Sequence, residues 1–174
     1  MHRAMDAVGH PPRFDGIFVA LNPATSVWNE TMWTRDINAM KAVNMSFFVL
    51  PHLVHQTGQP TAACDSGSFD VYFPLQGSGI PTACFKEAGL DSATHEGGTV
   101  GAILSAANAT ELTVHLGLAV EKDMDAAMQS QNETKIRTFA SLQWQVAQQL
   151  WRLASAAGLS HTVSGFYTEV EESK

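Results

Sequence analysis

The chain has 174 residues, of which 45% are hydrophobic and 16% are charged, and its formal net charge is −7. This composition is typical of a packed globular domain and excludes disorder of the whole chain. The ten Lys and Arg residues do not cluster, so we expect neither a nucleic acid nor an anionic membrane surface as a partner. No apolar run approaches the roughly 20 residues that cross a bilayer.

Four apolar runs alternate with stretches of helical periodicity along the chain. Strands are predicted at 14–21, 45–50, 111–120 and 161–170, and helices at 29–43, 99–108 and 134–157. Trp144 and Trp151 fall on the apolar stripe of the last helix, so we expect both side chains in the core.

The resulting βαβαβαβ order requires right-handed crossovers and a parallel sheet. Four such strands are half of an eight-stranded barrel. The predicted fold is therefore α/β and resembles the first half of a (β/α)8 TIM barrel, with residues 1–174 as a single incomplete domain. An open four-stranded sheet is the alternative. The turn at 21–25 contains no glycine, which argues against a Rossmann or P-loop site there, and no cofactor is expected.

Residues 56–97 are rich in glycine and proline and predict a long loop on the ligand-facing side of the fold. Cys64 and Cys84 lie within this segment. They either close part of the loop as a disulfide or remain two free thiols.

The alternation of side chains along each strand separates a face for the helices from an inward face. In the strand at 111–120, the helix-covered face is expected to hold Val114, Leu116, Leu118 and Val120. The inward faces of the first, third and last strands converge at their C-terminal ends on four side chains, Asn22, Glu121, Glu169 and Glu171. His52 follows the second strand, and His55 comes three residues later.

Carboxylates gathered at the mouth of a barrel fit glycoside hydrolysis, in which one carboxylic acid protonates the leaving oxygen and a second carboxylate attacks or activates water. The catalytic candidates are Glu121, Glu169 and Glu171; the alternative is that the acidic residues near the C-terminus form a solvated tail. The substrate-binding candidates are Asn22, Trp28, His52, His55 and Tyr167. Trp28 is either a platform for stacking a sugar or part of the core. His52 and His55 have no defined third ligand, so no metal is expected.

Four asparagines, Asn29, Asn44, Asn108 and Asn132, stand in N-x-S/T glycosylation sequons, where typical composition gives about one by chance. Asn44 is expected to open a buried strand, which favours coincidence. If the chain is the interior of a longer secreted protein, a secretory or extracellular location is favoured and the missing signal peptide is explained. Otherwise a cytoplasmic location is expected.

Three segments resemble a known family: the opening strand at 14–21, the passage WNETMWTRDINAMKAVNM at 28–45, and GFYTEVE at 165–171. The family is domain of unknown function 4434, a group of glycoside-hydrolase-like (β/α)8 barrels. The resemblance places Glu171 on the family's strand-end glutamate and matches Gly165 and Tyr167, whereas Glu169 stands where the family has proline. By analogy with retaining barrel glycosidases, it implies that Glu171 is the acid/base and that the nucleophile lies beyond Lys174, so this chain alone is inactive.

Three hypotheses follow from these observations. The first is a glycoside-hydrolase-like domain that acts on or binds a carbohydrate, with a homodimer as one way to complete the barrel. The second is a non-catalytic carbohydrate-binding or interaction module that uses the loop between Cys64 and Cys84. The third is a small open-sheet α/β domain with an unrelated cytosolic function.

Overall fold

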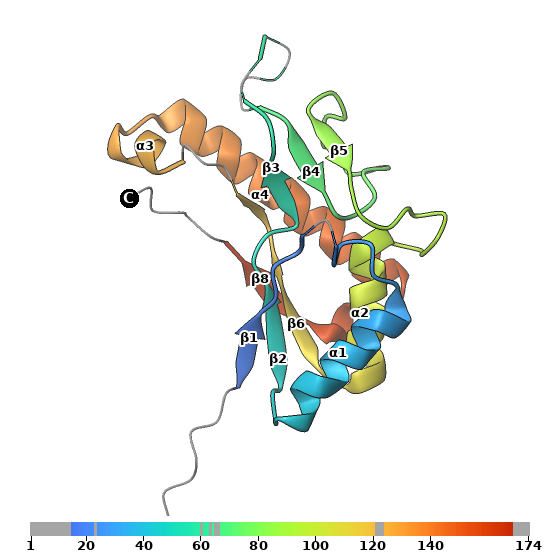
Figure 1. Ribbon diagram of the computed structural model, residues 1–174. Helices are drawn as coiled ribbons and strands as arrows, with labels where there is room; N and C mark the ends of the chain where they lie inside the picture. The colour runs from blue at the N-terminus through green and yellow to red at the C-terminus, as the bar shows by residue number, and fades with distance from the viewer. Residues whose placement is uncertain are drawn as a thin grey trace, which may run out of the picture.

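The computed structural model describes residues 15–22, 24–59, 61–62, 64, 67–120 and 124–168. Its main sheet, sheet A, contains β1 (Gly16–Phe18), β2 (Phe47–Leu50), β6 (Thr113–Gly117) and β8 (Val163–Tyr167) in the order β1-β2-β6-β8. All three neighbouring pairs are parallel (Figure 1). The predicted parallel α/β fold is confirmed, and each strand lies within its predicted range.

Three long helices connect these strands: α1 (Glu30–Ala42), α2 (Gly98–Thr110) and α4 (Glu133–Ala156). The side chain of Asn29 caps α1 by accepting a hydrogen bond from the Met32 N–H, and Asn132 caps α4 through the Lys135 N–H. After α1 the chain turns at Asn44, whose φ of 64° is left-handed. The sequence predicted that Asn44 would open a buried strand. In the structure, Asn44 is exposed in this turn.

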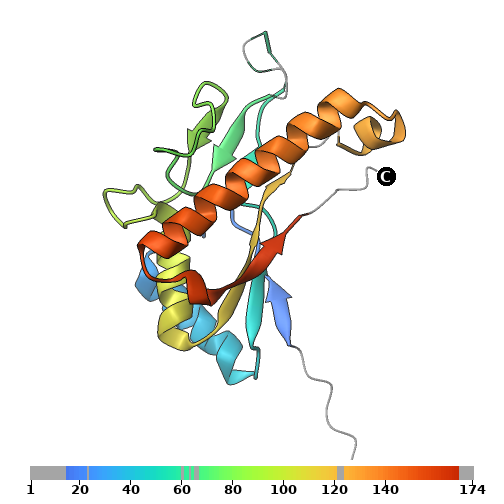
Figure 2. The same cartoon turned by 180° about the vertical axis from the view of Figure 1, so that it is seen from behind.

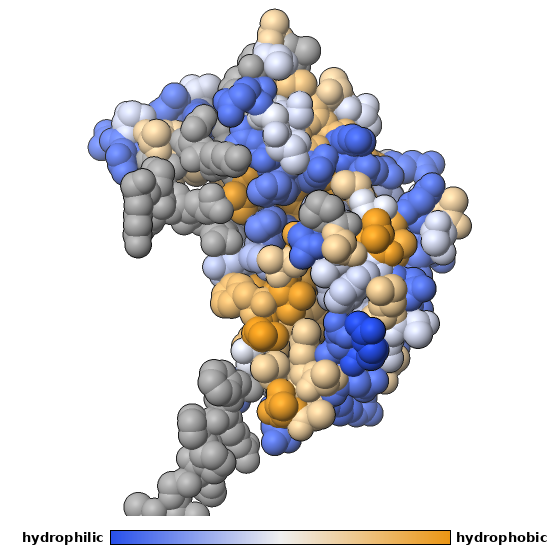
Figure 3. All heavy atoms as spheres, viewed as in Figure 1, coloured by the Kyte–Doolittle hydropathy of each residue, from blue (hydrophilic) through white to orange (hydrophobic). Residues whose placement is uncertain are grey.

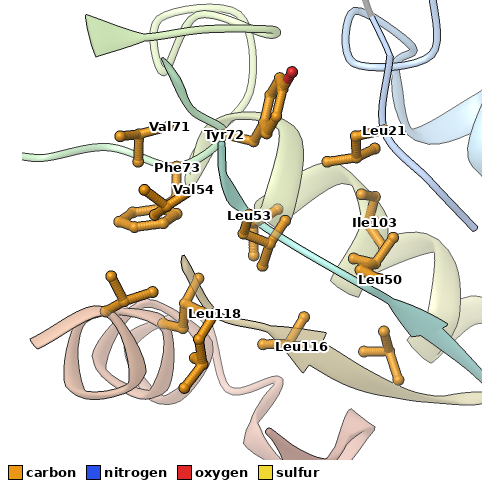
Figure 4. Packing of buried hydrophobic residues seen from close by; sticks show 14 of the residues in the cluster. Leu21, Leu50, Leu53, Val54, Val71, Tyr72, Phe73, Ile103, Leu116 and Leu118 are labelled. Atoms are coloured by element: carbon orange, nitrogen blue, oxygen red, sulfur yellow. The ribbon is translucent and has the colours of Figure 1, made fainter. Parts of the chain in front are cut away.

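The helices cover one face of sheet A, and the other face carries none of them (Figures 1 and 2). Phe48, Leu50, Val114 and Leu116 are fully buried on the covered face, as the alternation predicted for the third strand. The close-up in Figure 4 shows Leu50 and Leu116 on the strands near Ile103 of α2. This layer between sheet and helices is the main apolar core.

A second sheet, sheet B, extends the two central strands of sheet A. It contains β3 (Val54–Gln56), β4 (Phe69–Val71), β5 (Phe85–Glu87) and β7 (Ala119–Val120) in the order β5-β4-β3-β7. β3 follows β2, and β7 follows β6, with the break between the sheets near Leu53 and Leu118. There the Leu118 carbonyl accepts hydrogen bonds from the N–H groups of Leu53 and Val54, at 3.1 and 3.3 Å. A Cβ at Gly117 would overlap the backbone of Leu50 and Pro51, so the break requires glycine at this position.

The sequence predicted one long loop at residues 56–97. In the structure this segment contains β4 and β5. Each is only three residues long and is bounded by Gly or Pro turns, too short for a recognisable alternation of side chains. Cys64 and Cys84 form a disulfide, with their Cα atoms 5.5 Å apart, which joins the segment before β4 to the start of β5. Of the two alternatives from the sequence, a disulfide or two free thiols, the structure shows the disulfide.

The predicted apolar stripe of α4 is buried only in part. Trp144 and Trp151 are 65% and 49% exposed, whereas Phe139, Val146, Leu150 and Ala154 face the core together with two glutamines. Gln143 uses its side-chain amide to bond both the N–H and the carbonyl of Ala119, at 2.9 and 2.7 Å. Gln149 donates to the Pro74 carbonyl at 2.6 Å. The predicted apolar stripe is thus confirmed at Phe139, Ala147, Leu150 and Ala154 and is wrong at the two tryptophans.

A short helix, α3 (Met124–Gln129), precedes α4, and a 3-10 turn, η1 (Ser160–Thr162), leads into β8. Among the described residues, no helix combines the length and the apolar character needed to cross a bilayer.

Candidate functional site

The helix-free face of sheet A carries the rings of Phe18, Phe47, His115 and Tyr167, which we call the aromatic floor. Phe18, Val49, His115 and Gly165 form one row across the four strands, by register, and face away from the helices. The ring centroids of Phe18 and Tyr167 are 5.5 Å apart in an edge-to-face contact, although their strands are the two outermost of the sheet. Side chains standing perpendicular on a flat sheet would not meet across two intervening strands, so the sheet curls toward this face.

Glycines make room for the rings of this floor. Gly117 is the register partner of Tyr167, and a Cβ at Gly165 would lie 3.3 Å from Nδ1 of His115. A Cβ at Gly16 would overlap the ring of Phe47, which itself packs on His115 with the ring centroids 5.2 Å apart. The floor remains accessible, because Phe18 is 60% exposed. Figure 3 shows a hydrophobic surface where Figure 1 places β1 and β2.

Polar side chains lie beyond the C-terminal ends of the sheet A strands. His52, after β2, stacks on His55 of β3, with the ring centroids 5.1 Å apart and the planes 26° from parallel. His55 is the register partner of Asp70 in β4, and Tyr72 comes two residues later. We call His52, His55, Asp70 and Tyr72 the mouth cluster. Figure 3 shows hydrophilic surface over β3 and β4.

Tyr72 is held as a neutral phenol. Burial, and next the negative charge of Asp70, raise the pKa of Tyr72 above its usual value of 10.0. Figure 4 shows the hydroxyl of Tyr72 directed away from the apolar side chains. Tyr72 can therefore donate a hydrogen bond at neutral pH, whereas Asp70 offers acceptor oxygens.

The mouth cluster does not form a metal centre by itself. Within the described part of the chain, no three His, Cys, Asp or Glu side chains are close enough together to hold a metal ion. The Nδ1 atom of His55 is buried and has no hydrogen-bond partner among the same residues. Leaving a buried polar atom without a hydrogen bond costs free energy, so a ligand that bonds to Nδ1 of His55 would be stabilised there.

The remaining sequence candidates divide into two groups. Asn22 shapes the turn after β1, because its Oδ1 accepts hydrogen bonds from the N–H groups of Ala24 and Thr25 at 2.9 and 3.0 Å. Trp28 packs edge-to-face on the buried Trp33, with ring centroids 5.2 Å apart, and contributes to the core. Of the substrate-binding candidates, Tyr167 thus lies on the floor, and His52 and His55 lie in the mouth cluster.

The three catalytic candidates lie outside the described residues. They are Glu121, Glu169 and Glu171. Glu121 is the residue after the end of β7, and Glu169 follows the end of β8 by two residues. Asp70 and Tyr72 are site residues that the sequence reasoning missed, because it did not recognise β4.

A separate cavity of about 600 Å3 lies beside the disulfide, between sheet B and α4. Its apolar wall includes Phe69 and Phe85, whose rings stack with their centroids 4.9 Å apart. Its polar lining comes from Arg137, Ser141 and Gln145 of α4. The paired cysteines were the only sign of this cavity in the sequence.

The fold and these two surfaces define an α/β protein with an aromatic sheet face and a polar cluster at its strand ends. No protein-family model matches the sequence, and no curated protein or solved structure matches it either.

Proposed function

We propose that the helix-free face of sheet A is the inner wall of a glycoside-hydrolase-like barrel that binds or cleaves a carbohydrate. The observation that carries this proposal is the aromatic floor around Phe18 and Tyr167, where Phe18 is open to solvent. Aromatic faces pack against the apolar faces of sugar rings. The C-terminal ends of parallel strands are also where barrel enzymes place their ligand-binding groups.

We propose Glu171 as the general acid/base of the complete barrel. Glu169 and Glu171 follow Tyr167 by two and four residues, so they share its face if β8 continues as a strand. The resemblance of the segment 165–171 to a glycosidase-like family supports the same residue. The second carboxylate that glycoside hydrolysis needs comes, in this proposal, from Glu121 or from the chain that completes the barrel.

The binding half of the proposal is tested by titrating the protein with xylo-, cello-, manno- and chito-oligosaccharides in a calorimeter. Replacing Tyr167 by Ala should weaken the best ligand by roughly tenfold, or about 1.4 kcal/mol. Phe166→Ala is the matched control, since Phe166 is the preceding residue and its register partner Leu116 faces the helices. Equal affinities for the wild type and Tyr167→Ala would reject the aromatic floor as the binding surface.

The catalytic part of the proposal is tested on a form of the protein with a complete barrel, assayed on chromogenic glycosides. Glu171→Gln keeps the size of the side chain but removes the proton donor, so turnover should fall by at least 100-fold. Turnover that is unchanged in Glu171→Gln would remove Glu171 from the mechanism.

The cavity beside the disulfide supports a second candidate, a non-catalytic carbohydrate-binding or interaction module. Its stacked Phe69 and Phe85 and its polar α4 side chains are the usual combination in a small-molecule site. Ligand binding at this cavity would be lost in Gln145→Leu and in the reduced protein, and would persist in Tyr167→Ala. The same titration therefore separates the two candidates.

We also propose that a second copy of the chain covers the helix-free face. β1 and β8 are edge strands, and Phe18, on the helix-free face of β1, is 60% exposed. Unpaired edges next to exposed apolar side chains promote association. Pairing of two such sheets around their aromatic faces is the arrangement that a barrel requires.

A further inference from the structure

We propose that this protein is N-glycosylated, with Asn44 as the leading acceptor and Asn29, Asn108 and Asn132 as further acceptors. The oligosaccharide donor would be of the lipid-pyrophosphate-linked class. This inference concerns a modification of the surface and does not depend on the proposed carbohydrate ligand.

The first support is the position of the sequons in the fold. Four of the six asparagines in the chain have Ser or Thr two residues later, and all four are exposed. Asn44 lies in the left-handed turn between α1 and β2, with Ser46 also exposed. The burial that had favoured coincidence at Asn44 is therefore absent.

The second support is the bonding of the four carboxamides. The Oδ1 atoms of Asn29 and Asn132 cap helices, and Oδ1 of Asn108 is 2.8 Å from Nε2 of His161. Among the described residues, none of the four Nδ2 atoms donates a hydrogen bond. Glycosylation substitutes the nitrogen and leaves the oxygen in place, so both helix caps survive it.

The third support is the disulfide between Cys64 and Cys84. Stable structural disulfides form in the oxidising compartments through which secreted proteins pass, and those compartments also attach N-linked glycans. Sequons and disulfide thus point to the same environment, although they are separate features of the chain.

The attachment step balances without any redox partner. The side-chain nitrogen of Asn44 attacks the anomeric carbon of the oligosaccharide, and a C–N bond forms. The bond from that carbon to the pyrophosphate oxygen breaks, and the lipid pyrophosphate leaves with the bonding electrons. One proton of the nitrogen passes to a base of the transferase.

The two acceptors nearest the N-terminal ends of β2 and β6 would keep their glycans away from the mouth cluster. Asn44 precedes β2, and Asn108 lies in the last turn of α2 before β6. The two turns are joined by an ion pair between Lys41 and Glu111, with Nζ and Oε2 2.8 Å apart. A glycan there lies at the end of sheet A opposite to the candidate ligand site (Figure 1).

The test is translation of the full chain behind a secretion signal in the presence of microsomes, followed by treatment with peptide N-glycosidase F. Glycosylation is read as an enzyme-sensitive increase in mass, and Asn-to-Asp conversion identifies each acceptor by peptide mass spectrometry. Asn44→Gln and Ser46→Ala should each lose one glycan relative to the wild type. Ser46→Thr should retain it, because threonine completes the sequon equally well.

Asn38→Gln is the matched control, since Asn38 is an exposed asparagine in α1 without a sequon. It should give the wild-type mass. A translocated chain without any enzyme-sensitive mass would overturn the proposal, and an unchanged glycan number in both Asn44→Gln and Ser46→Ala would overturn the assignment of Asn44. The readout precedes folding and secretion, so a poorly folding variant still gives an answer.

Discussion

Phe18 and Tyr167 are in edge-to-face contact, with their ring centroids 5.5 Å apart, although they belong to the two opposite edge strands of sheet A. The contact spans β2 and β6, where Val49 is the register partner of Phe18 and Gly117 is the register partner of Tyr167. It links the N-terminal and C-terminal strands directly and gives the uncovered face an aromatic surface. Such edge-to-face pairs contribute about 1 kcal/mol beyond the area that they bury.

Loss of this contact should be measurable in stability as well as in ligand binding. We expect Phe18→Ala and Tyr167→Ala to lower the free energy of unfolding in urea by about 1 kcal/mol each. The double variant should lose less than the sum, because either change alone removes the pair. Strict additivity in this cycle would show that the two rings do not interact in solution.

Gln143 should stabilise the protein because it completes the hydrogen bonds of β7. We expect Gln143→Leu to lower the free energy of unfolding by about 1–3 kcal/mol, since two backbone groups of Ala119 lose their partner. Gln148→Leu is the matched control, because Gln148 lies on the exposed side of the same helix. A control variant as unstable as Gln143→Leu would contradict the role of the amide.

The disulfide should stabilise the fold by restricting the unfolded chain. Cys64 and Cys84 are 20 residues apart, and closing a loop of this length is worth about 3 kcal/mol in the chain-entropy model. We expect a loss of this order in urea unfolding after reduction and in the Cys64→Ser/Cys84→Ser double variant. Identical transitions with and without reductant would be inconsistent with a formed disulfide.

Tyr72 gives the protein a pH dependence in alkaline solution. Its pKa in the folded state is raised above 10.0, so the folded protein keeps the phenol proton that the unfolded chain releases near pH 10.0. The stabilisation is complete below the unfolded pKa and is lost as the pH rises through the folded pKa. Tyrosinate absorbance should show one tyrosine ionising late, and Tyr72→Phe should remove that phase.

Asp70→Asn separates the two causes of the raised pKa. Removing the charge should lower the pKa of Tyr72 only part of the way, because burial is the larger cause. A return to an ordinary titration in this variant would mean that Asp70, and not burial, controls the phenol.

Self-association should depend on the exposed floor. We expect the protein to sediment as a dimer at micromolar concentration, and Phe18→Asp to shift it toward monomer. The control is Trp144→Asp on α4, which changes an equally exposed aromatic residue on another surface. A monomeric wild type, or dissociation by both changes alike, would reject the proposed dimer face.

Much of the fold was predictable because it depends on local periodicity. The apolar alternation at Val114 and Leu116 identified a strand and its buried face, and the caps at Asn29 and Asn132 lie where the helices were expected to begin. β4 and β5 were not recognised, since three residues between turns carry too little pattern. For α4, the helical periodicity identified the buried Leu150 and Ala154, but it also placed the exposed Trp144 and Trp151 in the core.

The candidate site was predictable only in its outline. Strand parity indicated that Tyr167 faces inward, and the chain order placed His52 at a strand end. Asp70 and Tyr72 joined the site through a strand that the sequence did not reveal. The catalytic candidates Glu121, Glu169 and Glu171 stay predictions, because they lie outside the described residues.

The sequence by itself determined the α/β order, the parallel pairing and the division of each main strand into two faces. These properties follow from the spacing of apolar side chains and from the handedness of crossover connections. Tertiary structure alone decided that the tryptophans of α4 are exposed, how sheet B extends sheet A, and that Phe18 meets Tyr167. Each of these depends on contacts between residues far apart in the chain, whose energies no local pattern records.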